Sequence, residues 1–131
     1  MKLLFAFALL ITGCSSLPLK NEFHLVENQI YKTVEGEELK GDFYIPEGKR
    51  PMPAVLLVHG GGWNKRTGDM EGIAKDLAKS GYFVFNITYR LAPKHHFPDQ
   101  VNDVKDAIKF LKREASRLGI DPNHIAGWGY S

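Results

Sequence analysis

The chain has 131 residues, of which 44% are hydrophobic and 24% charged, a balance typical of one ordinary globular domain. Its net charge of +2 is too small to favour a nucleic-acid partner, and Lys and Arg form no dense block. A mean hydropathy of −0.24 argues against an integral membrane protein, and no apolar stretch downstream of the N-terminus is long enough to span a bilayer.

The N-terminus has the features of a secretory signal. Lys2 supplies a positive charge, and Leu3 to Ile11 form an apolar segment too short for a transmembrane helix. The segment runs into Thr12-Gly13-Cys14, which resembles the lipobox of bacterial lipoproteins, where the cysteine is acylated and becomes the new N-terminus. Cys14 is the only cysteine of the chain. The alternative is a plain signal peptide with an incidental cysteine.

These features predict a lipoprotein signal peptide over residues 1–13, lipid attachment at Cys14 and a polar tether over residues 14–28. The protein is then expected in the cell envelope, anchored to a membrane through its lipid. Ser15 and Ser16 follow the cysteine in place of an Asp, and by resemblance to sorted lipoproteins this favours the outer membrane.

The next segments predict a β-hairpin followed by a buried strand. Residues 29–34 and 39–45 are β-prone, and Glu35-Gly36-Glu37-Glu38 between them is typical of a turn. Residues 46–53 are rich in Pro, Gly and Lys and predict a loop. The apolar run over residues 54–58 is typical of a central strand covered on both faces.

The second half of the sequence alternates between helical and strand patterns. Helical spacing of apolar residues predicts a helix over 70–78, which Gly81 stops, and a long helix that begins near Pro98 and ends at Gly119. An apolar stripe runs along the long helix through Val101, Val104, Ile108, Leu111, Ala115 and Leu118. Strands are predicted over residues 82–89 and 124–128. The order strand, helix, strand, helix, strand predicts an α/β protein with a parallel sheet and helices on its faces.

A glycine-rich motif directly follows the first buried strand. His59-Gly60-Gly61-Gly62-Trp63 stands where the carboxyl end of a parallel strand commonly binds a ligand. Glycine leaves backbone N–H groups open to a substrate oxygen. We therefore predict that the N–H groups of Gly61 and Gly62 donate to the oxyanion of an acyl-transfer reaction. The alternative for such a run is a flexible turn.

A second motif closes the sequence. Gly129-Tyr130-Ser131 is the first part of a Gly-x-Ser-x-Gly nucleophile elbow, in which the serine sits on a sharp turn between a strand and a helix. This motif makes Ser131 the candidate nucleophile.

Taken together, these segments resemble the hormone-sensitive-lipase-like esterases of the α/β-hydrolase superfamily, and more narrowly the bacterial feruloyl- and acetylxylan-esterase-like carboxylesterases. The resemblance covers about residues 34–131 and includes three further motifs in order: residues 89–93 (Tyr-Arg-Leu-Ala-Pro), Phe97-Pro98, and residues 118–123. It implies the N-terminal half of an α/β-hydrolase fold over residues 29–131, an antiparallel hairpin followed by parallel strands with helices on both faces. Lys94 departs from the family pattern, which commonly has Glu after Ala-Pro.

The resemblance also implies an activity and a set of site residues. It implies a serine carboxylic-ester hydrolase that forms an acyl-enzyme on Ser131, without metal or cofactor, and acts on a small-molecule or carbohydrate ester. His59 is expected to shape the oxyanion loop rather than act as the base. The catalytic Asp and His of the family follow the nucleophile, so we expect the 131-residue chain by itself to be inactive and its last strand to be an exposed edge.

Two other functions stay open. A non-catalytic envelope lipoprotein could use the same half-fold for binding, and an amidase or peptidase could use the same serine and oxyanion loop. Other polar residues are given structural interpretations: His95-His96 as loop surface, Asp99 and Asp103 as first-turn helix acids, and Tyr89 and Arg90 as loop anchors.

Overall fold

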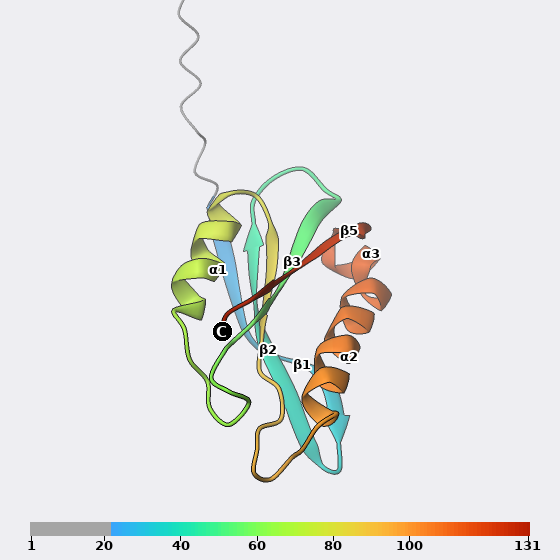
Figure 1. Cartoon of the computed structure of the whole chain (residues 1–131). Coiled ribbons are helices and arrows are strands. Elements are labelled where there is room, and N and C mark those ends of the chain that lie inside the picture. Colours follow the sequence, from blue (N-terminus) through green and yellow to red (C-terminus); the bar gives the residue numbers. More distant parts are fainter. Residues whose placement is uncertain (1–21) are drawn as a thin grey trace, which may run out of the picture.

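The computed structural model describes residues 22–131, and Figure 1 shows a single sheet flanked by helices. The predicted signal peptide, Cys14 and residues 14–21 of the predicted tether lie outside the described residues. In chain order the elements are β1 Phe23–Val34, β2 Glu37–Pro46, β3 Met52–Val58, α1 Met70–Lys79, β4 Phe83–Ile87, α2 Asp99–Arg113, α3 Ala115–Leu118 and β5 Ile120–Gly129.

The sheet has the mixed topology that the sequence predicts. Its strand order is β1-β2-β4-β3-β5, in which β1 pairs with β2 and β2 with β4 antiparallel, whereas β3 is parallel to both β4 and β5. Strand β5 therefore occupies an edge, as expected. Because β3, β4 and β5 run in the same direction, the loops that follow them emerge at one end of the sheet.

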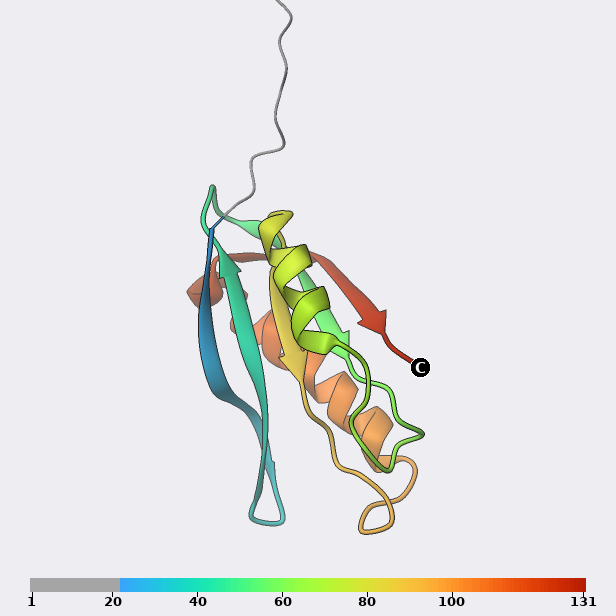
Figure 2. The same cartoon turned by 90° about the vertical axis from the view of Figure 1, so that its left-hand side faces the viewer.

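The two faces of the sheet carry separate cores, in agreement with the prediction of helices on both faces (Figures 1 and 2). Helix α1 covers one face, where Ala74 and Ala78 pack with Leu57 and Val84. Helices α2 and α3 cover the other face with a larger, aromatic-rich core: Phe43, Phe83, Phe85, Phe110, Leu111 and Leu118. Within residues 22–131, no helix is long and apolar enough to cross a membrane.

The hairpin is longer and its turn tighter than the sequence predicts. Strand β1 begins at Phe23, so the last six residues assigned to the tether belong to the sheet. The turn consists of Glu35 and Gly36 alone, both with positive φ (51° and 78°), and β2 begins at Glu37. Positive φ at both central positions matches the twist of the two strands, which favours a two-residue turn over the predicted four-residue one.

The predicted long helix is divided into α2 and α3 at Glu114, and it ends at Gly119 as expected. Gly119 has φ +69°, and a Cβ there would lie 2.4 Å from Arg50 Cδ. The Arg50 guanidinium donates to the carbonyl of Leu118 at 3.0 Å, which satisfies one of the helix-terminal acceptors. This compact ending allows β5 to begin at Ile120, four residues before the predicted start.

The apolar stripe predicted on the long helix is only partly buried. Side chains fully or nearly buried on α2 are Gln100, Asp103, Ala107, Phe110 and Leu111, whereas Val101 is 39% exposed. Val104 and Ile108 are half-buried against the core and line open hollows beside β3 and β5, whereas the stripe residues of α3, Ala115 and Leu118, are buried. The face of α2 that meets the sheet is therefore rotated from the predicted stripe and includes a carboxylate.

Candidate active site

The two predicted motifs meet at the carboxyl end of the parallel strands. The glycine loop follows β3 and Ser131 follows β5, which are neighbours in the sheet. The N–H of Tyr130 donates to the carbonyl of Val58 at 2.9 Å, so the β3–β5 pairing continues beyond Gly129 to the start of the loop. One open pocket is lined by both motifs and by Tyr89 from the segment after β4: His59, Gly60, Gly61, Gly62, Trp63, Tyr89, Tyr130 and Ser131.

The loop conformation requires glycine at two positions. Gly61 has φ +119°, and a Cβ there would lie 2.3 Å from the carbonyl oxygen of Lys65. At Gly60, a Cβ would lie 2.7 Å from the carbonyl oxygen of Tyr130. The absent side chain of Gly60 therefore lets the loop approach the backbone next to Ser131.

Hydrogen bonds hold the base of the loop and leave its tip open. Gly60 exchanges two backbone hydrogen bonds with Thr67, and the N–H of Ala92 donates to the carbonyl of Trp63 at 2.9 Å. Within residues 22–131, the N–H groups of Gly61 and Gly62 donate to no protein acceptor. Two free donors next to a serine are the chemical requirement for binding an oxyanion.

His59 is a buried part of the loop. Its side chain is 3% exposed and stacks on the Tyr89 ring, with 4.1 Å between centroids and 7° between planes. Its Nδ1 lies 2.9 Å from the Gly60 carbonyl oxygen, an acceptor, so this nitrogen carries the proton. Burial lowers the pKa of the imidazole, and the hydrogen bond to Gly60 only partly opposes this effect. These contacts support the loop-shaping role predicted for His59.

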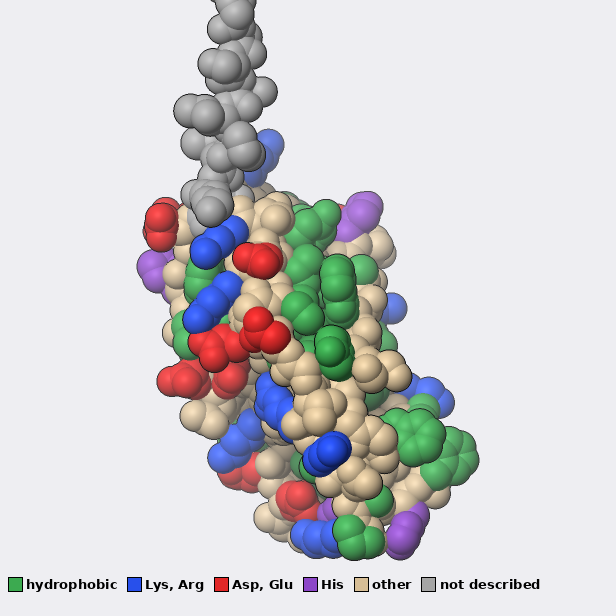
Figure 3. All heavy atoms as spheres, turned by 60° about the vertical axis from the view of Figure 1, so that its left-hand side comes forward, with side chains coloured by type: hydrophobic (Ala, Val, Ile, Leu, Met, Phe, Trp, Pro, Cys, Tyr) green, Lys and Arg blue, Asp and Glu red, His purple; other side chains and the backbone are tan. Residues whose placement is uncertain are grey.

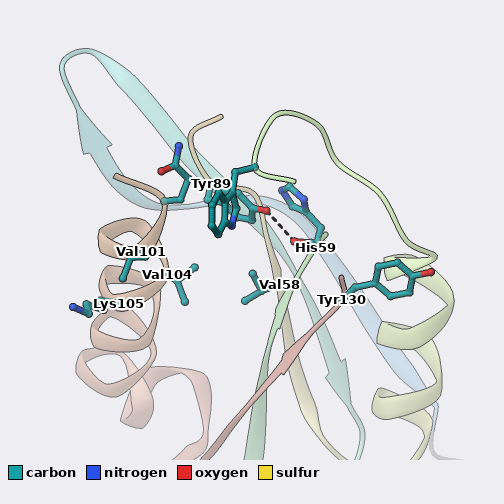
Figure 4. Close-up of a pocket in the computed structure, with 9 residues that line it drawn as sticks. Val58, His59, Tyr89, Val101, Val104, Lys105 and Tyr130 are labelled. Atoms are coloured by element: carbon teal, nitrogen blue, oxygen red, sulfur yellow. Dashed lines mark hydrogen bonds between the residues drawn. The ribbon is translucent and has the colours of Figure 1, made fainter. Parts of the chain in front are cut away.

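Two tryptophan side chains near Ser131 are exposed. Trp63 has φ +63°, a left-handed conformation that is uncommon for a large side chain, and is 64% exposed at the rim of the pocket. Trp128 on β5 is 48% exposed. Beside the pocket lies an apolar hollow of about 290 Å³, which reaches from Val58 to Val101 and Val104 on α2 (Figure 4).

A buried charge cluster centres on Asp103, and the sequence pattern does not reveal it. The Asp103 carboxylate on α2 is completely buried; it accepts hydrogen bonds from the Arg90 guanidinium at 2.9 Å, the Arg90 backbone N–H at 3.1 Å and Lys32 Nζ on β1 at 2.9 Å. Burial opposes ionisation of Asp103, but the bonds from Arg90 and Lys32 outweigh it and lower the pKa of the carboxyl. Asp103 is therefore a buried partner of Arg90 and not the first-turn helix acid expected, whereas Arg90 does anchor its loop.

The His95-His96 pair divides between two environments. His96 is exposed, as expected of loop surface, but His95 is 8% exposed and its Nε2 lies 3.1 Å from the Glu37 carboxylate. Lys94, the departure from the family pattern, also reaches Glu37, with 2.8 Å between Nζ and Oε2. In the described part of the chain, no three His, Cys, Asp or Glu side chains are placed to share a metal ion.

Comparison with known proteins agrees with this geometry. A mixed sheet whose parallel strands carry a glycine loop and a serine at their carboxyl ends fits the N-terminal part of an α/β-hydrolase fold, and the resemblance to carboxylesterases is confirmed. The family model BD-FAE matches residues 42–131, and the chain belongs to this family.

Several of the proteins similar to this chain are named esterases. Esterase LipC from Mycobacterium tuberculosis is 36% identical over 84 residues, which cover 63% of this chain and 21% of LipC. Among solved structures, a truncated carbohydrate esterase from gut microbiota is 28% identical with a TM-score of 0.71, covering 86% of this chain and 41% of that one. Thermogutta terrifontis esterase 2 is 27% identical with a TM-score of 0.73, covering 87% and 41%. The chain thus spans about a fifth to two fifths of these relatives.

Proposed function

We propose that this chain carries the nucleophile and oxyanion loop of a serine carboxylic-ester hydrolase. The observation that carries the proposal is one pocket that contains Ser131 together with the free N–H groups of Gly61 and Gly62. Ser131 Oγ attacks the ester carbonyl carbon, and the two N–H groups bind the oxyanion of the tetrahedral intermediate. The alcohol then leaves with a proton, and water releases the acid from the acyl-serine.

A general base for Ser131 is not present among the residues that line this pocket. The pocket's single imidazole belongs to His59, whose Nδ1–H is engaged with Gly60 and whose ring is buried against Tyr89. In the described residues, no Asp or Glu side chain lines the pocket. We therefore propose that residues 1–131 alone have no esterase turnover, since loss of a triad partner costs on the order of 10⁴ in kcat.

The experiment is an assay of the natural gene product that carries this sequence, with a series of p-nitrophenyl esters and matched p-nitroanilides. We expect ester hydrolysis that Ser131→Ala abolishes, with weak or no hydrolysis of the anilides. Faster cleavage of the anilides would favour the amidase or peptidase alternative. If Ser131→Ala hydrolyses the esters as fast as the wild type, Ser131 is not the nucleophile. Acetylated sugars belong in the same series, because one structural neighbour is named a carbohydrate esterase.

We also propose that the protein is a lipoprotein of the cell envelope, attached through Cys14. The support is the sequence Thr12-Gly13-Cys14 after an apolar segment. Cells fed a palmitate analogue should label the wild-type protein, and Cys14→Ser should abolish both the label and recovery in the membrane fraction. A labelled Cys14→Ser protein would contradict this assignment.

A further inference from the structure

We propose that Tyr89 is a positioning residue for the oxyanion loop, an inference that rests on the proposed esterase function. Tyr89 stands in the segment after β4, outside both catalytic motifs, and the sequence analysis gave it only a loop-anchoring role. Its side chain instead reaches across to the loop after β3 and holds His59 in two ways (Figure 4).

Tyr89 makes a double contact with His59. The Tyr89 hydroxyl donates to the backbone carbonyl of His59 at 2.9 Å, while the Tyr89 ring lies flat against the imidazole. The hydrogen bond restrains the backbone of residue 59, and the stack restrains its side chain. Both residues are nearly excluded from solvent, at 6% and 3% exposure, so water does not readily replace these contacts.

His59 in turn holds the backbone next to the free N–H donors of Gly61 and Gly62. The imidazole Nδ1 donates to the carbonyl of Gly60, and Gly60 is fixed on its other side by Thr67. The orientation of the following two peptide groups, which carry the N–H of Gly61 and Gly62, depends on how residues 59 and 60 are held. An oxyanion donor is effective only when it is fixed before the charge develops.

Tyr89 is itself held in place through the residue that follows it. The next residue, Arg90, is held through its backbone N–H and its guanidinium by the buried Asp103. Asp103 belongs to α2, and it also binds Lys32 on β1. The position of Tyr89 is therefore set by contacts that reach both the helix and the far strand of the sheet.

The test uses the ¹⁵N-labelled 131-residue chain and the variant Tyr89→Phe, with Tyr82→Phe as the matched control. Tyr82 is 39% exposed, and the structure gives its hydroxyl no partner in residues 22–131. We expect Tyr89→Phe to shift the amide signals of Gly61 and Gly62 and to speed hydrogen exchange at Gly60 and Thr67 about threefold to tenfold, the equivalent of one net hydrogen bond. The Tyr82→Phe spectrum should match the wild type in this loop.

A second variant separates the ring from the hydroxyl. Tyr89→Phe keeps the stack, so the ring-current shift of the His59 imidazole protons should persist, whereas Tyr89→Leu should abolish it. Unchanged Gly61 and Gly62 amide signals in both variants would overturn the proposal. A uniform rise in exchange across the whole sheet would also overturn it, because Tyr89 would then be an ordinary core residue.

The catalytic consequence is measured on the gene product used for the esterase assay. Tyr89→Phe should lower kcat about threefold to tenfold with KM changed less than twofold, because the hydroxyl acts on the oxyanion donors and not on substrate binding. An unchanged kcat alongside shifted loop amides would overturn the positioning role. If neither the wild type nor Tyr89→Phe hydrolyses esters, the proposed function is wrong. The contact between Tyr89 and the loop is then judged by the amide signals alone.

Discussion

At the scale of single residues, Asp103 is the most consequential side chain outside the pocket. Its carboxylate is fully buried and joins α2 to Arg90 and to Lys32 on β1. Arg90 is itself 6% exposed, and Asp103 is its nearest carboxylate, at 2.9 Å, whereas Asp99 lies 3.4 Å away. Buried ion pairs add little net stability compared with apolar residues, but removal of one partner leaves a charge without compensation.

We therefore predict that Asp103→Asn lowers the free energy of unfolding by about 3–5 kcal/mol, measured by urea denaturation of the 131-residue chain. The matched control is Asp106→Asn, one helical turn along α2, whose carboxylate is 31% exposed and binds Lys32 and Lys109. Its loss should cost less than about 1 kcal/mol. Equal losses in the two variants would contradict this account of the cluster.

The contribution of the Asp103 carboxylate to stability should depend on pH. Asp103 has its pKa lowered below the ordinary value of 3.8, so near and below that value the unfolded chain binds a proton at this site more readily than the folded chain. The stability that ionised Asp103 contributes is complete above pH about 4 and disappears as pH falls through the lower folded pKa. The difference in unfolding free energy between wild type and Asp103→Asn should therefore narrow below pH 4. If this difference in unfolding free energy stays constant down to pH 2, ionisation of Asp103 is not linked to folding in this way.

At the scale of elements, the ending of α3 decides where β5 starts. Gly119 adopts a left-handed conformation, and its missing Cβ leaves space for the Arg50 side chain. We predict that Gly119→Ala destabilises the chain by about 1–2 kcal/mol, because an L-residue resists this φ. Gly127→Ala on β5 is the control, since a Cβ there would meet nothing within 4 Å. Thermal unfolding of both variants tests the prediction. If Gly127→Ala loses as much stability as Gly119→Ala, the prediction is contradicted.

Sequence patterns predict the elements well where a local rule determines them. Buried strands β3 and β4, helix α1 and the stop at Gly119 follow from apolar runs, helical spacing and glycine chemistry. The pattern did not show which face of α2 would meet the sheet, because Asp103 is an acid whose burial depends on Arg90 thirteen residues earlier. Likewise, nothing local to Tyr89 indicates that its hydroxyl reaches His59, thirty residues earlier, at the end of the neighbouring strand β3.

At the scale of the whole molecule, strand β5 leaves one side of the sheet open. Most of its residues are exposed, and Trp128 and Tyr130 are 48% and 46% exposed. Figure 3 shows hydrophobic side chains forming a band on this side of the molecule, next to a charged surface. An unprotected apolar edge strand is a template for pairing with another chain.

We therefore predict that the 131-residue chain self-associates through β5, and that Gly127→Lys weakens the association. A charged side chain on an edge strand opposes pairing, and position 127 has open space for it. Sedimentation velocity over a concentration series measures the effect. Ser116→Lys, an exposed position on α3, adds the same charge away from the edge and should leave association unchanged. A chain that stays monomeric throughout would contradict the prediction.

The most direct test of the central claim is covalent labelling of Ser131 during ester turnover. The gene product that carries this sequence is incubated with a fluorophosphonate, then assayed with p-nitrophenyl acetate and digested for mass spectrometry. We predict that loss of hydrolysis follows the labelling of Ser131 one for one, and that Ser131→Ala neither turns over nor takes the label. Hydrolysis that persists in Ser131→Ala, or a label on another residue, would contradict the assignment of Ser131 as the nucleophile.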